Sequence, residues 1–323
     1  MRRALICGIG GQDGGYLARF LLDKGYAVFG TSRDAGNNDF QSLKRLGLHS
    51  RVSLTSMAPT DFRSVHAAIE WSSPDEIYAL SGQSSVGLSF EQPAQTLESI
   101  VLGTLNLLEA VRLQGGAARI YHASSSECFG DLAGVPATEL SAFRPCSPYG
   151  VAKTSAHLLV ASYRKAYGLF AANGILFNHE SPLRPERFVT RKITAAAARI
   201  AAGAQDRLRL GNLDIVRDWG WAPEYVEAMW RMLQVETPDD FIVATGQSRS
   251  LEDFVRAAFE SVDLDWREHV ESDASLGRPA DLQWSGGVPD KAEQVLGWKA
   301  ARHMPDVARL MVEADRVGTE QGR

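Results

Sequence analysis

The sequence predicts an α/β fold, with a doubly wound parallel sheet and a smaller C-terminal substrate-binding domain. Two observations support this fold class. Short β-rich runs alternate with longer helical patterns through the first half, and a glycine-rich turn follows the first of these runs. A chain of 323 residues is long enough for one large domain and a smaller partner.

The first half contains apolar runs and periodic segments in strict alternation. Strands are expected at residues 4–7, 27–30, 52–54, 76–80, 119–123 and 169–177. Helices are expected at residues 14–24, 62–71, 96–113 and 149–167. Strands separated by helices form right-handed βαβ units, so we expect the strands to be parallel.

The second half has a different pattern. The alternation ends after residue 177, and the stretch 181–187 contains prolines and charged residues typical of a crossing between domains. Beyond it, amphipathic helices are expected at 224–233 and 251–262, separated by loops with scattered arginines.

Composition and charge exclude several functions. The formal net charge of -5 argues against a nucleic-acid partner, because such proteins need basic surfaces. The three cysteines and seven histidines lack the spacing of a disulfide framework or a metal site, so no metal is expected. No apolar stretch reaches the roughly 18 residues of a membrane span, and we expect a cytoplasmic protein that binds no membrane.

The glycine-rich turn follows the first expected strand and opens the first helix. Gly8, Gly11 and Gly14 allow a tight turn and let backbone N–H groups approach a pyrophosphate. A plain strand-to-helix turn is the alternative, and the surrounding βαβ pattern favours a Rossmann-type dinucleotide site. After the second strand, Arg33 comes first and suits a 2′-phosphate, which favours NADP over NAD. Asp34 follows it and suits a ribose 2′-hydroxyl, so NAD stays an alternative.

A tyrosine and a lysine lie four residues apart at the start of the helix expected at 149–167. This spacing places Tyr149 and Lys153 on one helix face, where the ammonium lowers the pKa of the phenol and favours base catalysis. Ser125 and Glu127 follow the strand 119–123, at the sheet edge where ligands bind. Taken alone, the Tyr-Lys pair can be an exposed surface pair and Glu127 a surface charge.

These motifs resemble the extended short-chain dehydrogenase/reductase superfamily and, within it, the GDP-mannose 4,6-dehydratase family. The resemblance covers almost the whole chain, from about residue 4 to 315. The matching segments are residues 8–18, 83–86, 89–93, 147–153, 174–182, 188–193, 210–214, 217–220 and 225–230. Of these, 174–182 and 188–193 are the most specific.

The resemblance implies a lyase of deoxysugar biosynthesis that converts GDP-mannose to GDP-4-keto-6-deoxymannose with NADP. Tyr149 would take the C4 hydroxyl proton, and Lys153 would hold the nicotinamide ribose. Glu127 would remove the C5 proton and carry it to the leaving C6 hydroxyl, while Ser125 would hydrogen-bond the reacting groups. Ser125 stands where the family has threonine, which keeps the hydroxyl but loses the methyl group.

The resemblance also implies two binding sites and a division of the chain. The cofactor set is Gly8, Gly11, Gln12, Asp13, Gly14, Arg33, Tyr149 and Lys153. The substrate set is Gln83, Ser84, Asn178, Lys192, Arg217 and Arg278. Residues 1–177 with about 222–246 are expected to bind NADP, and 178–221 with 247–323 to bind the nucleotide sugar.

The chain departs from the family pattern at two places near the cofactor. Ala58 replaces the aspartate that usually contacts adenine, and the loop 33–38 differs from the arginine-serine loop that supports a tetramer. We expect a homodimer or a homotetramer.

Two alternatives use the same fold. A reductase or epimerase on a GDP- or related nucleotide-sugar would need Tyr149 and Lys153 but no base at Glu127. A non-catalytic NADP-sensing protein would be free to lose Tyr149 or Lys153, and neither is lost. The retention of Glu127 beside a hydroxyl favours the dehydratase over a reductase or epimerase.

Overall fold

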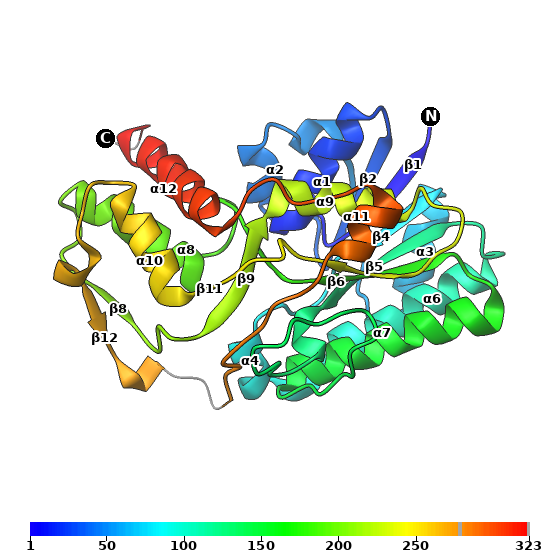
Figure 1. The fold of residues 1–323 in the computed structure, drawn as a ribbon. Helices are drawn as coiled ribbons and strands as arrows, with labels where there is room; N and C mark the ends of the chain where they lie inside the picture. The colour runs from blue at the N-terminus through cyan, green and yellow to red at the C-terminus, as the bar shows by residue number, and fades with distance from the viewer. Residues whose placement is uncertain (277–279, 322–323) are drawn as a thin grey trace.

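The computed structural model describes residues 1–276 and 280–321. Its centre is a seven-stranded sheet in the order β10-β6-β5-β4-β1-β2-β3, in which every neighbouring pair is parallel (Figure 1). The strands are β1 (Arg3–Cys7), β2 (Ala27–Ser32), β3 (Ser53–Ser56), β4 (Glu76–Ala79), β5 (Arg119–Ser125), β6 (Ala171–Leu176) and β10 (Asp240–Val243). The predicted doubly wound α/β fold is confirmed.

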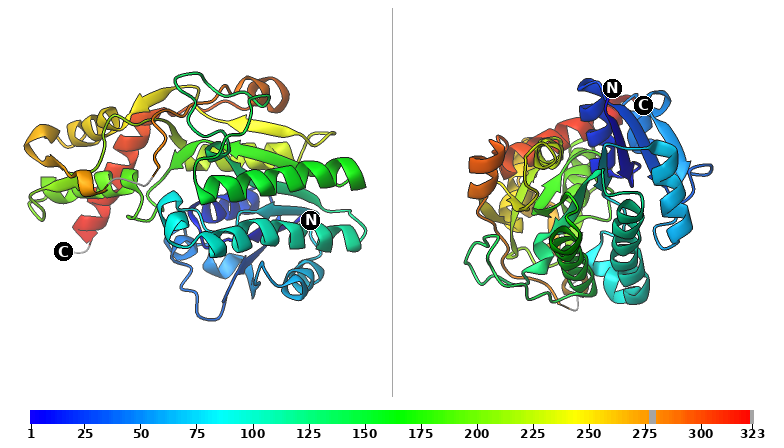
Figure 2. Two further views of the ribbon diagram at one scale, coloured as in Figure 1. Left: turned by 90° about the horizontal axis from the view of Figure 1, so that it is seen from below. Right: turned by 90° about the vertical axis from the view of Figure 1, so that its right-hand side faces the viewer.

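Helices cover both faces of this sheet. Helices α3 (Phe62–Ser72), α6 (Gly103–Leu113) and α7 (Pro148–Tyr167) pack on one face, and α1 (Gln12–Asp23) and α9 (Ala222–Met232) on the other (Figures 1 and 2). Successive residues of a strand point to opposite faces of the sheet, so they pack against different layers of helices. In β1, Leu5 lies in the α3–α6 layer and Ile6 in the α1–α9 layer. Because both faces are covered, the central strands β1 and β4–β6 are almost wholly buried, as their burial patterns show.

A smaller part of the molecule holds the other elements (Figure 1). A three-stranded sheet joins β7 (Asn178–Glu180), β9 (Val216–Trp221) and β11 (Ser248–Ser250), and β8 (Leu208–Leu210) pairs with β12 (Val270–Ser272). Helices α8 (Val189–Ala201), α10 (Leu251–Glu260) and α12 (Met304–Gln321) pack together. Their shared core is built from apolar side chains such as Trp219, Phe254 and Phe259.

The chain passes between the two parts more than once. It leaves the large sheet after β6 and enters β7, and the predicted crossing at 181–187 is a loop leading to α8. After β9, helix α9 returns to pack on α1, and β10 pairs with β6. The short helix α11 (Asp290–Leu296) also packs on α9 and β10. The assignment of one part to cofactor and the other to substrate remains a proposal.

One expected element differs from the structure. The helix expected at 96–113 is divided into α5 (Pro93–Leu97), the π-helical turn η2 (Glu98–Leu102) and α6. Its hydrophobic period is continuous across the three pieces, so the sequence pattern did not show the break. The short helices α2 (Gln41–Arg45) and α4 (Val86–Glu91) complete the first half.

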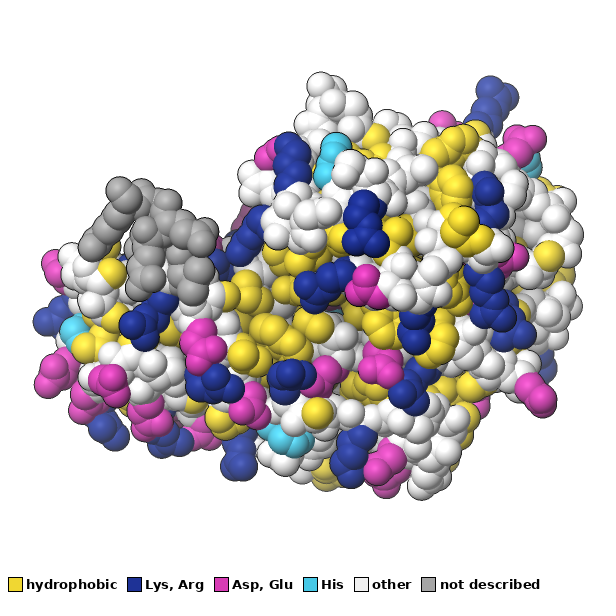
Figure 3. All heavy atoms as spheres, turned by 90° about the horizontal axis from the view of Figure 1, so that it is seen from above, with side chains coloured by type: hydrophobic (Ala, Val, Ile, Leu, Met, Phe, Trp, Pro, Cys, Tyr) yellow, Lys and Arg dark blue, Asp and Glu magenta, His cyan; other side chains and the backbone are white. Residues whose placement is uncertain are grey.

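The surface carries mixed charge. On the face shown in Figure 3, basic and acidic side chains are interspersed, and no continuous basic stripe crosses this face. Among the described residues, no helix is both long and apolar enough to cross a membrane. Within the same residues, no three His, Cys, Asp or Glu side chains gather as metal ligands would.

Candidate active site

The glycine turn between β1 and α1 is shaped by close backbone contacts. Gly8 has a φ of +89°, which favours glycine. A Cβ on Gly14 would lie 2.6 Å from the carbonyl oxygen of Gly8, so only glycine fits there. Helix α1 begins after Gly11 with no side-chain cap, which leaves its first N–H groups available. The turn therefore fits a pyrophosphate at the helix N-terminus.

The loop after β2 distinguishes between the two possible cofactors. The Asp34 carboxylate accepts hydrogen bonds from the backbone and side chain of Asn37, at 3.1 and 2.7 Å, and these bonds lower its pKa. Asp34 is thus engaged within its own loop. Arg33 beside it is exposed. Because the Asp34 carboxylate is already hydrogen-bonded and the Arg33 guanidinium is exposed, the loop fits a 2′-phosphate, and therefore NADP.

Tyr149 and Lys153 lie on the first two turns of α7, which Ser147 caps by accepting a hydrogen bond from the Gly150 N–H at 3.0 Å. The Lys153 ammonium lies 5.8 Å from the centre of the Tyr149 ring and donates a 2.8 Å hydrogen bond to the Ala123 carbonyl on β5. Both side chains are less than a tenth exposed. The predicted one-face arrangement is confirmed.

The electrostatics of this pair differ from the sequence expectation. Burial raises the pKa of Tyr149 above its ordinary value, and the Glu127 charge raises it further, although a hydrogen bond with Ser125 opposes both. Burial also lowers the pKa of Lys153 to about 8. The net shift of the Tyr149 pKa is upward because desolvation of the phenol is the largest effect on it, whereas the expected lowering by Lys153 stays a prediction.

The end of β5 brings the other two predicted catalytic residues to the same place. Ser125 is its last residue, and its hydroxyl accepts a 3.3 Å hydrogen bond from the Glu127 N–H. Glu127 lies in the 3₁₀ turn η3 (Ser126–Cys128), near enough for its charge to act on Tyr149. The structure thus gathers Ser125, Glu127, Tyr149 and Lys153 at the carboxyl edge of the sheet.

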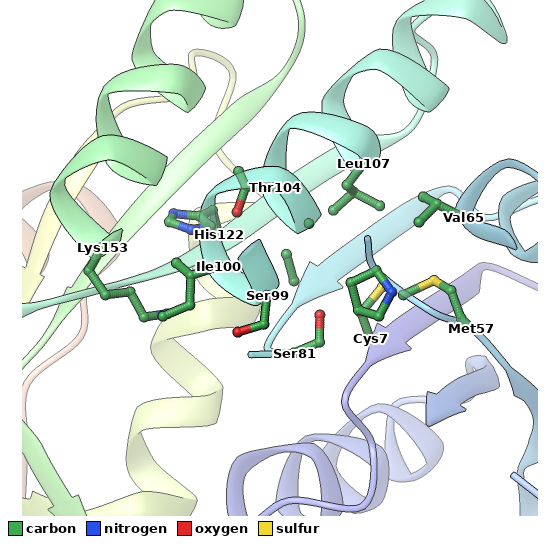
Figure 4. A pocket seen from close by; sticks show the side chains of 13 residues that line it. Cys7, Met57, Val65, Ser81, Ser99, Ile100, Thr104, Leu107, His122 and Lys153 are labelled. Carbon is green, nitrogen blue, oxygen red and sulfur yellow. The ribbon is translucent and has the colours of Figure 1, made fainter. Parts of the chain in front are cut away.

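A cavity lies beside these residues, between the carboxyl ends of the central strands and the turn η2 (Figure 4). Its polar lining includes Ser81, Ser99, His122 and Lys153, and Cys7 and Ile100 are among its other lining residues. The cavity lies at the edge where open parallel sheets bind their ligands.

The residues predicted to bind substrate are spread over both parts. Gln83 and Ser84 lie between β4 and α4, and the Gln83 amide donates to the Ser85 carbonyl at 2.8 Å. Asn178 begins β7, directly beyond the end of β6. The β7–β9 register pairs Asn178 with Trp219, two residues from Arg217. The structure therefore brings Asn178 and Arg217 close together.

The two remaining predicted cations are placed differently. Lys192 on α8 donates a 2.7 Å hydrogen bond to the Arg209 carbonyl. Arg278 lies outside the described residues. Arg217 itself is buried, at 6% exposure, and forms a 3.2 Å ion pair with Asp281.

His179 has a charged partner that its position in the sequence did not indicate. The His179 Nε2 lies 3.0 Å from the Asp13 carboxylate, and its Nδ1 donates to the Phe177 carbonyl at 2.8 Å. Burial lowers the pKa of His179, but Asp13 raises it more, so the net shift is upward. Burial likewise raises the pKa of Asp13, but the charge and hydrogen bond of His179 bring it to about 2. His179 therefore balances the negative charge of Asp13 at the start of α1.

Arg184 is a second residue that sequence analysis did not select. It lies in the loop before α8, with its guanidinium 3.8 Å from the centre of the Phe188 ring. Its charge lowers the pKa of both Asp13 and Tyr149, which places it near the glycine turn and Tyr149. The proline-rich run around it suggested only a crossing between domains.

Comparisons with known proteins agree with this site. A family model described as GDP-mannose 4,6 dehydratase matches residues 5–311. The chain is 45% identical to GDP-mannose 4,6 dehydratase 2 of Arabidopsis thaliana, over 97% of this chain and 86% of that protein. It is 43% identical to GDP-mannose 4,6-dehydratase of Sinorhizobium fredii, over 97% of this chain and 96% of that protein.

Solved structures share the fold. UDP-glucose 4-epimerase of Thermus thermophilus, in complex with NAD, superposes with a TM-score of 0.85 at 25% identity, over 98% of this chain and 99% of that one. RMD of Pseudomonas aeruginosa, complexed with NADPH, superposes with a TM-score of 0.81 at 22% identity, over the same shares. The second similarity shows the fold alone.

Proposed function

The chain belongs to the GDP-mannose 4,6-dehydratase family, and on that premise we propose how its residues convert GDP-mannose to GDP-4-keto-6-deoxymannose. The reaction is that of a hydro-lyase. The observation that carries the proposal is the gathering of a tyrosine-lysine pair and a separate carboxylate, Glu127, at one sheet edge. A reductase or epimerase would need no such carboxylate.

The cofactor is NADP, and the described residues fit it. When bound, it accepts and returns a hydride, and its oxidised nicotinamide brings a positive charge to the site. Gly8, Gly14 and the first N–H groups of α1 would hold the pyrophosphate. Arg33 would hold the 2′-phosphate, and Lys153 the nicotinamide ribose. Arg184, which pairs with Glu180 at 3.2 Å, would add positive charge near Asp13 at the start of α1.

Tyr149 acts on the C4 hydroxyl of the sugar. Its phenolate oxygen takes the hydroxyl proton as the C4 ketone forms, and the Lys153 ammonium stabilises the phenolate. The Ser125 hydroxyl, which is hydrogen-bonded to Tyr149, orients the reacting oxygen. Burial keeps the phenol protonated without ligands, so the tyrosine becomes a base only when positive charge joins the site.

Glu127 acts on C5 and C6. The ketone at C4 acidifies the C5 hydrogen, which a Glu127 carboxylate oxygen removes. The same carboxyl group then gives its proton to the departing C6 hydroxyl, so that water leaves. Once the hydride taken from C4 has been returned to C6, Tyr149 would give C5 the proton that it took from the C4 hydroxyl. Because the net change is loss of one water, the cofactor ends in the oxidation state in which it began.

The guanosine diphosphate is assigned to the smaller part of the molecule. Asn178, Lys192 and Arg217 are proposed to hold it, with Arg278, while Gln83 and Ser84 face the sugar. Arg217 supports this assignment because its planar guanidinium suits a diphosphate and its backbone is fixed in β9.

We propose a homodimer because apolar side chains are exposed together on one surface of the molecule. Helices α6 and α7 lie side by side on the outside of the sheet (Figure 2). Val151 and Leu158 on α7 are 43% and 55% exposed and seven residues apart, hence on one helix face, and Leu102 just before α6 is also exposed. A homodimer through this surface would bury them. All three cysteines are free, which supports a cytoplasmic location.

The reaction is tested by incubating the purified protein with GDP-mannose and NADP. Mass spectrometry of the sugar nucleotide should show the loss of one water molecule with no net cofactor reduction. In heavy water, one deuterium should appear at C5, as removal of that proton requires. A product of unchanged mass would contradict the dehydratase and favour an epimerase.

A further inference from the structure

One extended segment of the chain connects the smaller part of the molecule to the large part. Residues 281–288, the connecting segment, lead from the smaller part to α11, which packs on β10 and α9 (Figure 1). Its first half pairs with β9. The Gln283 carbonyl accepts a hydrogen bond from the Val216 N–H at 2.8 Å, and the Ser285 N–H donates to the Val216 carbonyl at 3.0 Å. The connecting segment is therefore bonded to β9 directly beside Arg217.

The connecting segment is also bonded to the loop between η3 and α7, through the side chain of Asp131. The Oδ2 atom of Asp131 accepts a 2.6 Å hydrogen bond from the Gln283 N–H. Its Oδ1 atom accepts a 2.8 Å hydrogen bond from the Ala133 N–H, within the same turn. Gln283 thus joins the Asp131 carboxylate to Val216, the neighbour of Arg217, through two short hydrogen bonds.

The loop that carries Asp131 is fixed to the catalytic edge at its start. Phe129, just after η3, is buried in an apolar cluster with residues of β6 and β10. A Cβ on Gly150 would lie 2.8 Å from the Glu127 carbonyl oxygen, so the first turn of α7 lies directly against η3. Glu127 and Tyr149 therefore belong to one packed unit, and Asp131 follows Glu127 closely in the chain.

The two ends of the proposed substrate bind to different parts of the molecule. The diphosphate lies on C1 of the sugar and is assigned to the smaller part, where Arg217 would hold it. The carbons C4, C5 and C6 react at Tyr149 and Glu127, which belong to the large part. The separation of the two parts must therefore match the sugar, because a misplacement of about 1 Å can slow a reaction about a hundredfold.

We propose that Asp131 is a positioning residue that fixes Arg217 relative to the catalytic edge, so that C4, C5 and C6 of a sugar held by its diphosphate reach the reacting groups. Asp131 acts through the connecting segment, which is bonded to β9 and also contacts the Arg217 side chain. In that contact, the Asp281 carboxylate lies 3.2 Å from the Arg217 guanidinium. The role of Asp131 rests on the proposed function of Arg217 and of the catalytic edge.

The charge of Asp131 strengthens its bond to the connecting segment. Burial raises the pKa of Asp131, but hydrogen bonds from the Ala133 and Gln283 N–H groups, together with the Arg217 charge, lower it more. Asp131 is therefore an ionised acceptor at neutral pH, and its bond to Gln283 is charge-assisted. Asp131 is also exposed, so a shorter side chain at this position leaves no buried cavity.

The kinetic test uses Asp131→Ser in the full chain with NADP bound. A serine hydroxyl can still accept the N–H group two residues later, but it is too short to reach Gln283. Because the sugar is then misplaced, kcat should fall about tenfold. The affinity for GDP, measured by calorimetry, should stay within about twofold, because its proposed contacts lie in the smaller part. Asp265→Ser is the matched control and should leave kcat unchanged, because the Asp265 carboxylate accepts the Arg267 N–H at 3.0 Å within its own turn.

A second measurement does not depend on turnover. Hydrogen–deuterium exchange of the NADP-bound protein, read by mass spectrometry, should show that GDP slows exchange in residues 281–288. Through the bond to Asp131, GDP should also slow exchange in residues 129–137. In Asp131→Ser, the slowing should be confined to residues 281–288, whereas Asp265→Ser should behave as the unmodified protein. Asp131→Ala serves for both measurements if the serine variant does not fold.

Three results would contradict the role of Asp131. The first is an unchanged kcat in Asp131→Ser. The second is a loss of GDP affinity as large as the loss of kcat, which would indicate a role in binding or in local folding. The third is slowed exchange of residues 129–137 that persists in Asp131→Ser with GDP. Failure of the proposed function is seen separately in the unmodified protein, as no loss of water from GDP-mannose or no binding of GDP.

Discussion

The catalytic edge of the large sheet and the substrate-facing side of the smaller part are built in different ways. At the catalytic edge, Tyr149, Lys153 and Ser125 are each less than a tenth exposed and have partners on other elements. In the smaller part, Lys192 is only half-buried and bonds to a backbone carbonyl of the same part. Folding alone thus orients the groups at the catalytic edge, whereas Lys192, one of the cations proposed to hold the diphosphate, has a contact that a ligand can replace.

The largest expected difference between the two regions comes from removing the phenol oxygen of Tyr149. Tyr149→Phe should lower kcat about a thousandfold, because the C4 hydroxyl proton then has no acceptor. The affinity for GDP should stay within about twofold, since it depends on the other part. Rates by mass spectrometry and GDP binding by calorimetry check both. A variant with a tenth of the original activity would show that Tyr149 is not the base.

The second substitution at the catalytic edge affects the later steps. Glu127→Gln should lower kcat about a hundredfold, because C4 oxidation proceeds but the C5 proton has no acceptor. Absorbance should show reduced cofactor accumulating without dehydrated product. Glu91→Gln, at an exposed glutamate of α4, is the control and should be fully active. Full activity in Glu127→Gln would remove this residue from the mechanism.

In the smaller part, we expect a different kinetic signature. Arg217→Met should raise KM for GDP-mannose about tenfold and change kcat by less than threefold, because its contacts are the same in the ground and transition states. Arg209→Met is the control, since Arg209 is largely exposed and lies 3.4 Å from Glu271. If kcat of Arg217→Met fell about tenfold, as much as KM rises, both regions would act in catalysis. The contrast between the two regions would then be wrong.

The smallest expected effect concerns the ion pair between the regions. The pKa of His179 is raised, so its stabilisation is complete below the unfolded value near 6.5 and is lost as pH rises through the folded pKa. The pKa of Asp13 is lowered to about 2, so its stabilisation is present above 3.8 and is lost as pH falls toward 2.

His179→Asn should therefore lower Tm by about 2–4 °C at pH 6. The difference from the unmodified protein should shrink at higher pH, and scanning calorimetry from pH 5 to 9 measures it. A difference that grows with pH would contradict the assigned sign.

Local patterns predicted the catalytic edge well. Strand periodicity, the glycine turn and the four-residue spacing of Tyr149 and Lys153 are all short-range features, and each placed its residues correctly. The pairing of Asp13 with His179 spans 166 residues, and no local pattern reports it. The hydrogen bonds of Asp240 with Arg164 and Asn173 escaped for the same reason, because they join β10 to α7 and β6.

The smaller part was less predictable. Its strands β7, β8, β11 and β12 have three residues each, too few to show alternation. Their pairing partners are also distant, as in β8 with β12. The family resemblance selected Arg217 and Asn178 as substrate-binding residues. Their residue types alone favour exposed positions on the surface. Arg278 lies outside the described residues, so its assignment stays a prediction.

Strand β10 also bears on how the chain folds during synthesis. A ribosome releases the N-terminal half first, and residues 171–176 of β6 then form a sheet edge whose partner, residues 240–243, has not yet been made. Unpaired edges of this kind recruit other chains. The first 177 residues also lack α9, whose Tyr225, Val226 and Met229 are buried against that sheet, so we expect them to be a poor independent folding unit.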